Sequence, residues 1–505
     1  MARSVYSRIQ LQGTLVAQSP LHVGGHGEDV DTDLPLARDG AGQLYVPGTS
    51  LAGALRELAE RLFGESVVDE LWGYQDRDRG HASFVVVDDA EVEDSASVAV
   101  EIRDHVGIDR EFGAAAEHIK YDRAVLPRGA RMKLRLALDV PDEDQRTPAL
   151  AMLAALRQAM EDGEVRLGAA KTRGLGHVRL EEGRLTECFL GSRVGILAAL
   201  KRPGGEPVPQ NDIDRAKQAY PPRKRPRLSL RIHWKPIGPF MVKAGYDGIA
   251  ADMLPLLSAR EGGMALVLPG SSIKGAFRDR AECIVRTVRG ETRPKWLDKE
   301  GKKKFLDAVQ VELVEYLFGA AKQRDQAPDL GLSALSVIDC FATQSVSVDH
   351  WQAVQAAGTD RELREFLDKA GLSHWSEAYH VAVDRWLGSA AESMLYTIVE
   401  PHRTEWEPLT LETDLRRLPD DLRLPAIALL LLVIRDLAQD RLPLGFATHR
   451  GMGAIKVTGL EIQGRDLEGD LENVSRVELR DGRFRNLPES LKTAWRRWAT
   501  QEVPA

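Results

Sequence analysis

Residues 47–56 spell PGTSLAGALR, and residues 269–278 spell PGSSIKGAFR. Two further motifs return in the same order: HVGIDR at 105–110 becomes HVAVDR at 380–385, and LGAAKTRGLG at 167–176 becomes LGFATHRGMG at 444–453. This repeat is much longer than the roughly 20–50 residues of solenoid repeats. The sequence therefore predicts two related domains, in which any site of one has a counterpart in the other.

Composition limits the class of protein only broadly. The chain has 505 residues, a net charge of −8 and three widely separated cysteines, Cys188, Cys283 and Cys340. This cysteine usage argues against a disulfide framework or a structural zinc site and favours a reducing cytoplasm. No apolar run is long enough to span a bilayer. The mild acidity does not exclude a nucleic-acid partner, because a basic groove can coexist with an acidic outer face.

The order of elements predicts an α+β fold. Each unit opens with an alternating apolar and polar strand, at 8–17 and 228–234. A helix follows that Ser50 or Ser272 is placed to cap, then β-rich segments, a second helix at 147–160 or 424–439, and a last strand. This is the order of a ferredoxin-like sandwich. We predict domains at 1–200 and 228–505, joined by a Pro-rich, charged linker at 201–227.

The second unit is expected to contain an insertion. Pro47 and Asp109 are 62 positions apart, whereas Pro269 and Asp384 are 115 positions apart. We place the extra residues at about 285–375, between the first helix and the second HV motif. The basic stretch 281–304 belongs largely to this region, and its role is left open.

A loop before each PG motif carries carboxylates. Aligning Pro20 with Pro239 places Asp33 on Asp252. Asp247 aligns with a second acidic residue of the first loop. Such carboxylates suit metal binding or general-base chemistry, although aspartates are also common as turn formers. Their recurrence in both units favours function, although a shared turn would recur as well.

The other motifs could contact phosphates. Backbone N–H groups of the Gly-rich loops and of the helix starts can bind anions, and nearby cations could add contacts. A tight turn and an ordinary helix cap explain the same residues equally well.

Taken together, these motifs resemble the RAMP superfamily of CRISPR systems, and most closely the backbone subunits of type III effector complexes. The resemblance covers nearly the whole chain, and two such domains in one chain are similar to the fused backbone subunits of type III-D-like systems. It implies two modified RRM folds with thumb hairpins, near 110–125 and 385–405. It also implies CRISPR guide RNA, target RNA and other type III subunits as partners: the signature large subunit, further RAMP backbone subunits and small subunits.

Residue roles follow from the same resemblance. One loop aspartate per domain, Asp33 or Asp252 with Asp247 in reserve, would cleave the target RNA with Mg²⁺ or another divalent metal, which Asp33 and Asp252 would bind. Ala52 stands where the family usually has lysine. The residues expected to contact RNA are Ser50, Arg56, Arg110, Lys171 and Arg173 in the first unit, and Ser272, Lys274, Arg278, Arg385, His449 and Arg450 in the second.

Three alternatives remain open from the sequence. The chain could be an RNA-binding backbone whose aspartates are idle. It could be a metal-independent enzyme that processes CRISPR RNA with a histidine such as His22 or His26. It could also be a two-domain scaffold that binds no nucleic acid.

Overall fold

The computed structural model describes residues 4–25, 32–108, 115–202, 204–245, 247–260, 262–290, 311–320 and 331–500. The chain divides into two compact units, each with its own hydrophobic core. Unit 1 comprises residues 1–105, 120–171 and 175–224, and unit 2 comprises 106–119, 172–174 and 225–505. In the described part of the chain no helix is long and apolar enough to cross a membrane.

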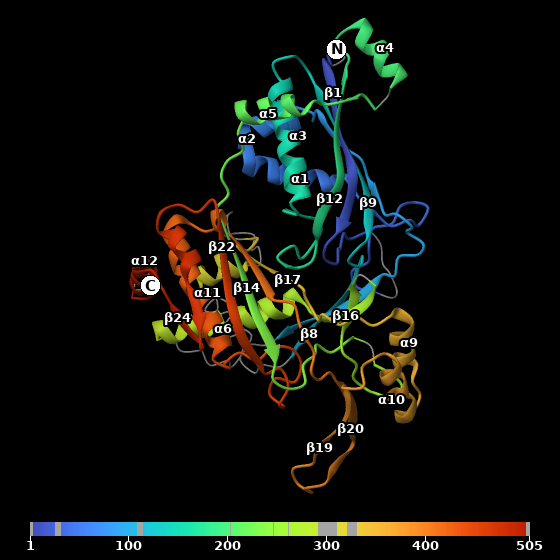
Figure 1. The fold of residues 1–505 in the computed structure, drawn as a ribbon, viewed down its shortest axis with the longest axis vertical. Helices are drawn as coiled ribbons and strands as arrows, with labels where there is room; N and C mark the ends of the chain where they lie inside the picture. The colour runs from blue at the N-terminus through green and yellow to red at the C-terminus, as the bar shows by residue number, and fades with distance from the viewer. Residues whose placement is uncertain are drawn as a thin grey trace. The chain divides into compact units, whose positions relative to one another are not determined.

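Unit 1 is built on an antiparallel sheet covered by helices on one face. The strand β1 (Ser7–Ala17) pairs with β12 (His177–Phe189) on one side and β9 (Arg131–Val140) on the other, and β5 (Val85–Val87) pairs with β9. Alternate residues of β9 are buried, as expected for a strand with one face on the core. The helices α1 (Gly48–Phe63) and α3 (Arg146–Glu161) pack on that face (Figure 1).

Unit 2 repeats this plan. The strand β14 (Arg227–Pro236) pairs with β22 (Ile455–Arg465) and β21 (Leu409–Asp414), and β17 (Leu335–Ile338) pairs with β21. The sheet order β22-β14-β21-β17 thus matches β12-β1-β9-β5 of unit 1, with β11 (Arg173–Gly174) beyond β17. The helices α6 (Gly270–Arg289) and α11 (Arg423–Ala438) pack together beside the sheet. The predicted ferredoxin-like repeat is confirmed.

The helices begin three residues earlier than expected. Pro47 and Pro269 are the N-cap residues of α1 and α6, and the helices start at Gly48 and Gly270. Ser50 therefore lies within the first turn, where its amide donates to the carbonyl of Pro47 rather than its side chain capping the helix. The fixed φ of proline suits a helix entrance, which is the physical reason for the shift.

Each repeat of the sequence contains one two-stranded hairpin, which we call the thumb. In the first thumb β7 (Glu101–Ile108) pairs with β8 (Ala115–Val125), and in the second β19 (Ser376–Val383) pairs with β20 (Ala390–Glu400). The second thumb is the long hairpin at the foot of Figure 1. Both hairpins start before the ranges expected at 110–125 and 385–405, because the HV motif itself forms the first strand.

The segment 201–227 is more than a linker. It contains β13 (Glu206–Pro207), which pairs with β12, and α5 (Gln210–Ala219), which packs on α3. Ile213 and Ala216 of α5 are buried in the core of unit 1. Apolar residues three positions apart share a helix face, so this segment completes unit 1 despite its charge and prolines.

The region expected as an insertion, 285–375, also contains counterparts of unit 1. The helix α8 (Glu312–Phe318) corresponds to α2 (Glu65–Trp72), and β18 (Cys340–Phe341) corresponds to β6 (Ala90–Glu91). Within this region, the described helices without a counterpart in unit 1 are α9 (Val348–Ala356) and α10 (Asp360–Lys369). Most of the basic stretch, residues 291–304, lies outside the described residues.

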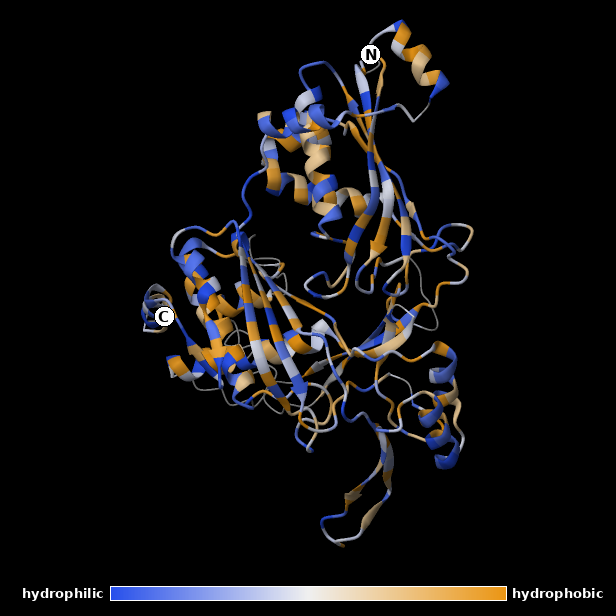
Figure 2. Ribbon diagram, viewed as in Figure 1, coloured by the Kyte–Doolittle hydropathy of each residue, from blue (hydrophilic) through white to orange (hydrophobic). Residues whose placement is uncertain are grey.

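The remaining elements are short or peripheral. Figure 2 shows that α4 (Arg193–Lys201) is largely apolar, and none of its residues is buried. These elements are β2 (Tyr45–Val46), β3 (Tyr74–Asp76), β4 (Arg79–His81), β10 (Val165–Arg166), α4 (Arg193–Lys201), β15 (Leu257–Arg260), β16 (Gly263–Leu268), β23 (Glu478–Arg480), β24 (Arg483–Arg485), α12 (Glu489–Ala499) and the 3₁₀ helices Leu415–Arg417, Asp420–Leu422 and Gly469–Arg476.

Candidate functional site

The loop aspartates of both units are held against the second thumb strand. In unit 1 a carboxylate oxygen of Asp33 accepts a hydrogen bond from the backbone N–H of Asp122 in β8, at 3.0 Å. In unit 2 a carboxylate oxygen of Asp252 accepts one from the N–H of Thr397 in β20, at 2.7 Å. The two aspartates therefore make the same contact with the same strand of their own unit.

The neighbouring backbone repeats this correspondence. Ala124 donates to the carbonyl of Leu34 at 3.0 Å, and Val399 donates to the carbonyl of Met253 at 3.1 Å. Each acceptor directly follows its loop aspartate, and each donor lies two residues beyond the residue that binds the carboxylate. The alignment of the two aspartates, inferred from an ungapped offset, is thus reproduced by the fold.

The thumb residues that bind the two loop aspartates differ between the units. In unit 1 the Asp122 carboxylate accepts from the hydroxyl of Thr32 at 2.6 Å and from the N–H of Asp33 at 2.8 Å. Thr397 occupies the equivalent place in unit 2 and brings no carboxylate. Among the described residues, the first site consequently has two carboxylates and the second site has one.

This arrangement suits a loosely held metal ion better than a closed metal centre. Among the described residues no group of three His, Cys, Asp or Glu side chains is placed to hold a metal. Mg²⁺ commonly binds through one or two carboxylates and keeps several waters. The exposed carboxylates of Asp33 and Asp252 are compatible with that mode of binding.

The reserve candidate Asp247 lies in a different environment. Its carboxylate forms an ion pair with Lys243 at 3.2 Å, and its side chain is 64% exposed. Within the part of the chain that the structure describes, no hydrogen bond ties it to the thumb. Its sequence counterpart Glu28 lies outside the described residues.

Beside each aspartate, a tyrosine stacks on the histidine of the HV motif. His105 and Tyr121 lie 5.0 Å apart between ring centroids, at 19° between planes. His380 and Tyr396 repeat this stack at 5.4 Å and 13°. Each tyrosine directly precedes the residue whose N–H binds the loop aspartate. Sequence reasoning missed both tyrosines, although their equal spacing from the HV motif could have revealed them.

In unit 2 the Gly-rich loop belongs to the same site. A small apolar cluster joins Met253 of the aspartate loop, Ile398 of β20 and Met452 of the Gly-rich loop. An Nη atom of Arg450 donates to the Tyr396 hydroxyl at 2.6 Å. The structure therefore brings together three motifs that are more than 50 residues apart in the sequence.

The expected anion site at the helix starts is filled by the protein itself. The N–H of Gly48 donates to the Asp89 carboxylate at 2.6 Å, and the N–H of Gly270 donates to that of Asp339 at 2.8 Å. Side chains are excluded at these glycines, because a Cβ on Gly48 would lie 2.3 Å from the carbonyl oxygen of Val87. Asp89 and Asp339 are a further repeated pair that the sequence analysis did not single out.

Several residues predicted to contact RNA have partners within the protein. Arg56 binds Glu60, Asp69 and the carbonyl of Gly73, the residue that ends α2. Arg278 repeats this arrangement with Glu282 and the carbonyl of Gly319, and burial lowers its pKa.

Two predicted lysine contacts also have partners within their units. Lys274 is 5% exposed and donates to the Ser333 hydroxyl and the Leu335 carbonyl. The ammonium of Lys171 lies 3.8 Å from a carboxylate oxygen of Glu57. Long polar side chains at regular spacing can stabilise a fold as readily as they bind RNA, and the sequence does not separate the two uses.

Of the other residues predicted to contact RNA, Ser50 is half-buried and Arg110 lies outside the described residues. The remaining five are exposed to solvent: Arg173, Ser272, Arg385, His449 and Arg450.

The histidine proposed for an alternative chemistry is buried. His22 is 4% exposed, and its Nδ1 lies 2.7 Å from the carbonyl oxygen of Ala124, so Nδ1 carries the proton and donates. Burial lowers the pKa of His22 and so favours the neutral ring. This environment favours a structural role, and His26 lies outside the described residues.

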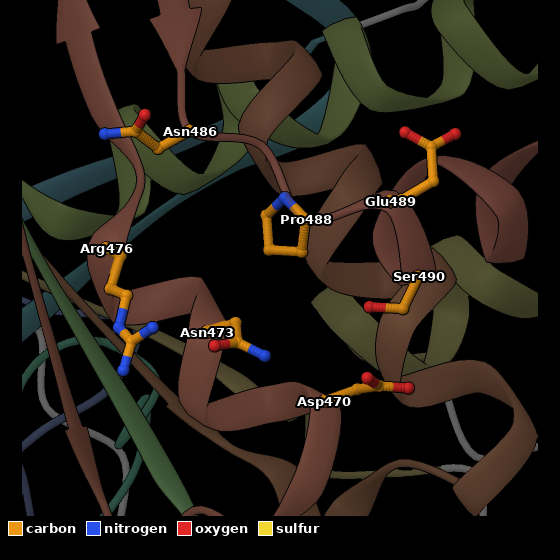
Figure 3. Close-up of a pocket in the computed structure, with 7 residues that line it drawn as sticks. All are labelled: Asp470, Asn473, Arg476, Asn486, Pro488, Glu489 and Ser490. Carbon is orange, nitrogen blue, oxygen red and sulfur yellow. The ribbon is translucent and has the colours of Figure 1, made fainter.

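A surface pocket in unit 2 contains none of the predicted site residues. It has a volume of about 420 Å³ and lies where the 3₁₀ helix Gly469–Arg476 meets the start of α12 (Figure 3). Carboxylates, amides and one arginine are mixed in its lining: Asp470, Asn473, Arg476, Asn486, Pro488, Glu489 and Ser490.

Comparison with known proteins agrees with the repeat. The model of the RAMP superfamily matches residues 14–179 and 258–456, which together make up more than half of the chain. A curated relative, "CRISPR system Cms endoribonuclease Csm3" of Methanocaldococcus jannaschii, is 23% identical over 202 residues, covering 35% of this chain and 80% of the relative. Because two RAMP regions match and each coincides with one repeat of the fold, the chain is a tandem member of the RAMP superfamily.

Proposed function

We propose that this protein is the guide-RNA-binding backbone of a type III CRISPR complex and cleaves complementary target RNA once per unit. The observation that carries the proposal is the repeated bond between a loop aspartate and the second thumb strand. The relative named an endoribonuclease supports RNA cleavage as the reaction class. Other type III subunits, including the large signature subunit and small subunits, would complete the complex in the cytoplasm.

The thumbs would supply the geometry of the reaction. An RNA 2′-hydroxyl attacks the adjacent phosphorus only when it lies in line with the leaving 5′ oxygen, and a regular duplex holds it out of line. A thumb that displaces one nucleotide would distort the backbone at that step. Base pairing with the guide would provide sequence specificity, while the protein holds the backbone.

The loop aspartates would act at the distorted step. Asp33 or Asp252 would accept the proton of the 2′-hydroxyl, a bond would form from that oxygen to phosphorus, and the bond to the 5′ oxygen would break. The products are a 2′,3′-cyclic phosphate and a 5′-hydroxyl, the latter protonated by water. A divalent ion bound at these carboxylates would stabilise the charge that develops on the phosphate. The backbone N–H of Asp122 or Thr397 holds each carboxylate in place.

The test is a cleavage assay on the assembled complex with a guide, Mg²⁺ and a labelled complementary RNA. We expect Asp33→Asn and Asp252→Asn each to remove a different product band, with 5′-hydroxyl ends on the remaining fragments. Asp247→Asn tests the reserve candidate: because no hydrogen bond among the described residues ties Asp247 to the thumb, we expect all product bands to persist in this variant. If all bands persist in the double variant Asp33→Asn/Asp252→Asn, the chain is a guide-binding scaffold and the nuclease lies elsewhere.

A further inference from the structure

Two contacts orient the guanidinium of Arg450, which belongs to the Gly-rich loop. Its guanidinium donates to the Tyr396 hydroxyl at 2.6 Å and lies 5.5 Å from the ring centroid of Phe446. Within the described residues it forms no ion pair with a carboxylate, and it is exposed. By contrast, Arg56 and Arg278 form ion pairs with carboxylates of their own units. Arg450 is therefore a pre-oriented cation available to an anionic ligand.

Tyr396 is in turn held by the root of the thumb. Its ring stacks on His380, whose Nε2 lies 3.5 Å from a carboxylate oxygen of Glu400. With the ring fixed on one side, the phenolic oxygen has a defined position for Arg450. This orientation lowers the entropy that a long arginine side chain would lose on binding a ligand.

The next residue of the same strand binds the loop aspartate. Thr397 follows Tyr396 and donates its N–H to Asp252. The cluster of Met253, Ile398 and Met452 packs the aspartate loop, the thumb strand and the Gly-rich loop together. The carboxylate and the guanidinium are consequently anchored on adjacent residues of one strand.

We propose that Arg450 contacts the scissile phosphate of the target RNA at the second site, with Tyr396 as its positioning residue. The inference rests on the proposed function and replaces the guide contact expected for Arg450. The bond to tyrosine uses one Nη and leaves the other donors of the guanidinium for phosphate oxygens. Pre-oriented donors stabilise the extra negative charge of the pentacoordinate transition state more than the ground state.

The experiment measures single-turnover cleavage by the guide-loaded complex and follows the product band that Asp252→Asn removes. We expect Tyr396→Phe to slow that band about tenfold and Arg450→Lys about a hundredfold, because lysine lacks the planar fork. The double variant should be no slower than Arg450→Lys alone, since both changes disturb one contact. Guide affinity, target affinity and the Asp33-dependent band should stay within about twofold of wild type.

Two controls match these substitutions. Tyr379→Phe makes the same change on the same thumb, at a tyrosine that binds Asp360 and Glu377. Arg483→Lys makes the same change at an exposed arginine of β24. Both should cleave at wild-type rates.

Each contrary outcome has a separate meaning. If Asp252→Asn removes its band while Tyr396→Phe and Arg450→Lys cleave normally, the role of Arg450 is refuted and the proposed function stands. If Arg450→Lys weakens guide binding without slowing cleavage by bound complex, Arg450 is a guide contact and the inference is wrong. If none of these variants, including Asp252→Asn, changes any band, both proposals fail.

Discussion

Replacing Arg56 by alanine should loosen the fold of unit 1 without removing a contact to RNA. The guanidinium of Arg56 joins α1 to the end of α2 through Glu60, Asp69 and the carbonyl of Gly73. Its side chain is 34% exposed, so solvent screens the two ion pairs, which we take at about 0.2–1 kcal/mol each. The charged bond to the carbonyl adds about 1.5 kcal/mol. The expected loss is about 2 kcal/mol of local stability.

Hydrogen exchange measures this loss where it occurs. A change of about 2 kcal/mol corresponds to roughly 30-fold faster exchange of amides in α1 and α2. The salt dependence of guide binding should not change, because no phosphate contact is removed. Arg184→Ala is the control for charge, since that side chain is 77% exposed. Unchanged exchange in Arg56→Ala, together with a salt slope reduced by about one, would refute the structural role.

Three further changes test other parts of the structure. Gly48→Ala should lower the midpoint of thermal unfolding by the equivalent of about 1–3 kcal/mol, because its Cβ meets a carbonyl of β5, whereas Gly53→Ala, with open space around it, should be neutral or stabilising. His22→Asn keeps a hydrogen-bond donor but cannot titrate. Because burial lowers the pKa of His22, the wild type should lose stability relative to this variant as pH falls below about 6.5. Urea unfolding measures this difference, and parallel pH profiles of the two proteins would contradict it. Asp122→Asn should slow only the product band that depends on the first loop aspartate, and equal slowing of both bands would exclude a local role.

The repeated motifs predicted the fold because each motif begins, forms or precedes a particular helix or strand. The PG motif begins a helix, the HV motif forms a thumb strand, and the Gly-rich loop precedes the last strand. The pairing of Asp33 with Asp252 was also accessible, because the ungapped loop preserves their distance from the preceding proline. Each of these signals is local in sequence, where residue spacing and backbone conformation are directly linked.

The contacts between motifs could not be predicted in the same way. That Tyr396 lies between His380 and Arg450 depends on strand pairing and on the return of the chain after α11. The internal use of Lys274 depends on its burial, which a single sequence does not report. The helix α5 was missed because prolines and charges mask its two core residues, Ile213 and Ala216.

The difference between Asp122 and Thr397 has a consequence for how such a protein can change. A filament assembled from identical subunits repeats every substitution at every step. A chain that carries two copies is free of that constraint, because each codon affects only one of its two units. One unit can therefore keep a second carboxylate while the other keeps a hydroxyl, and every chain contains one unit of each kind.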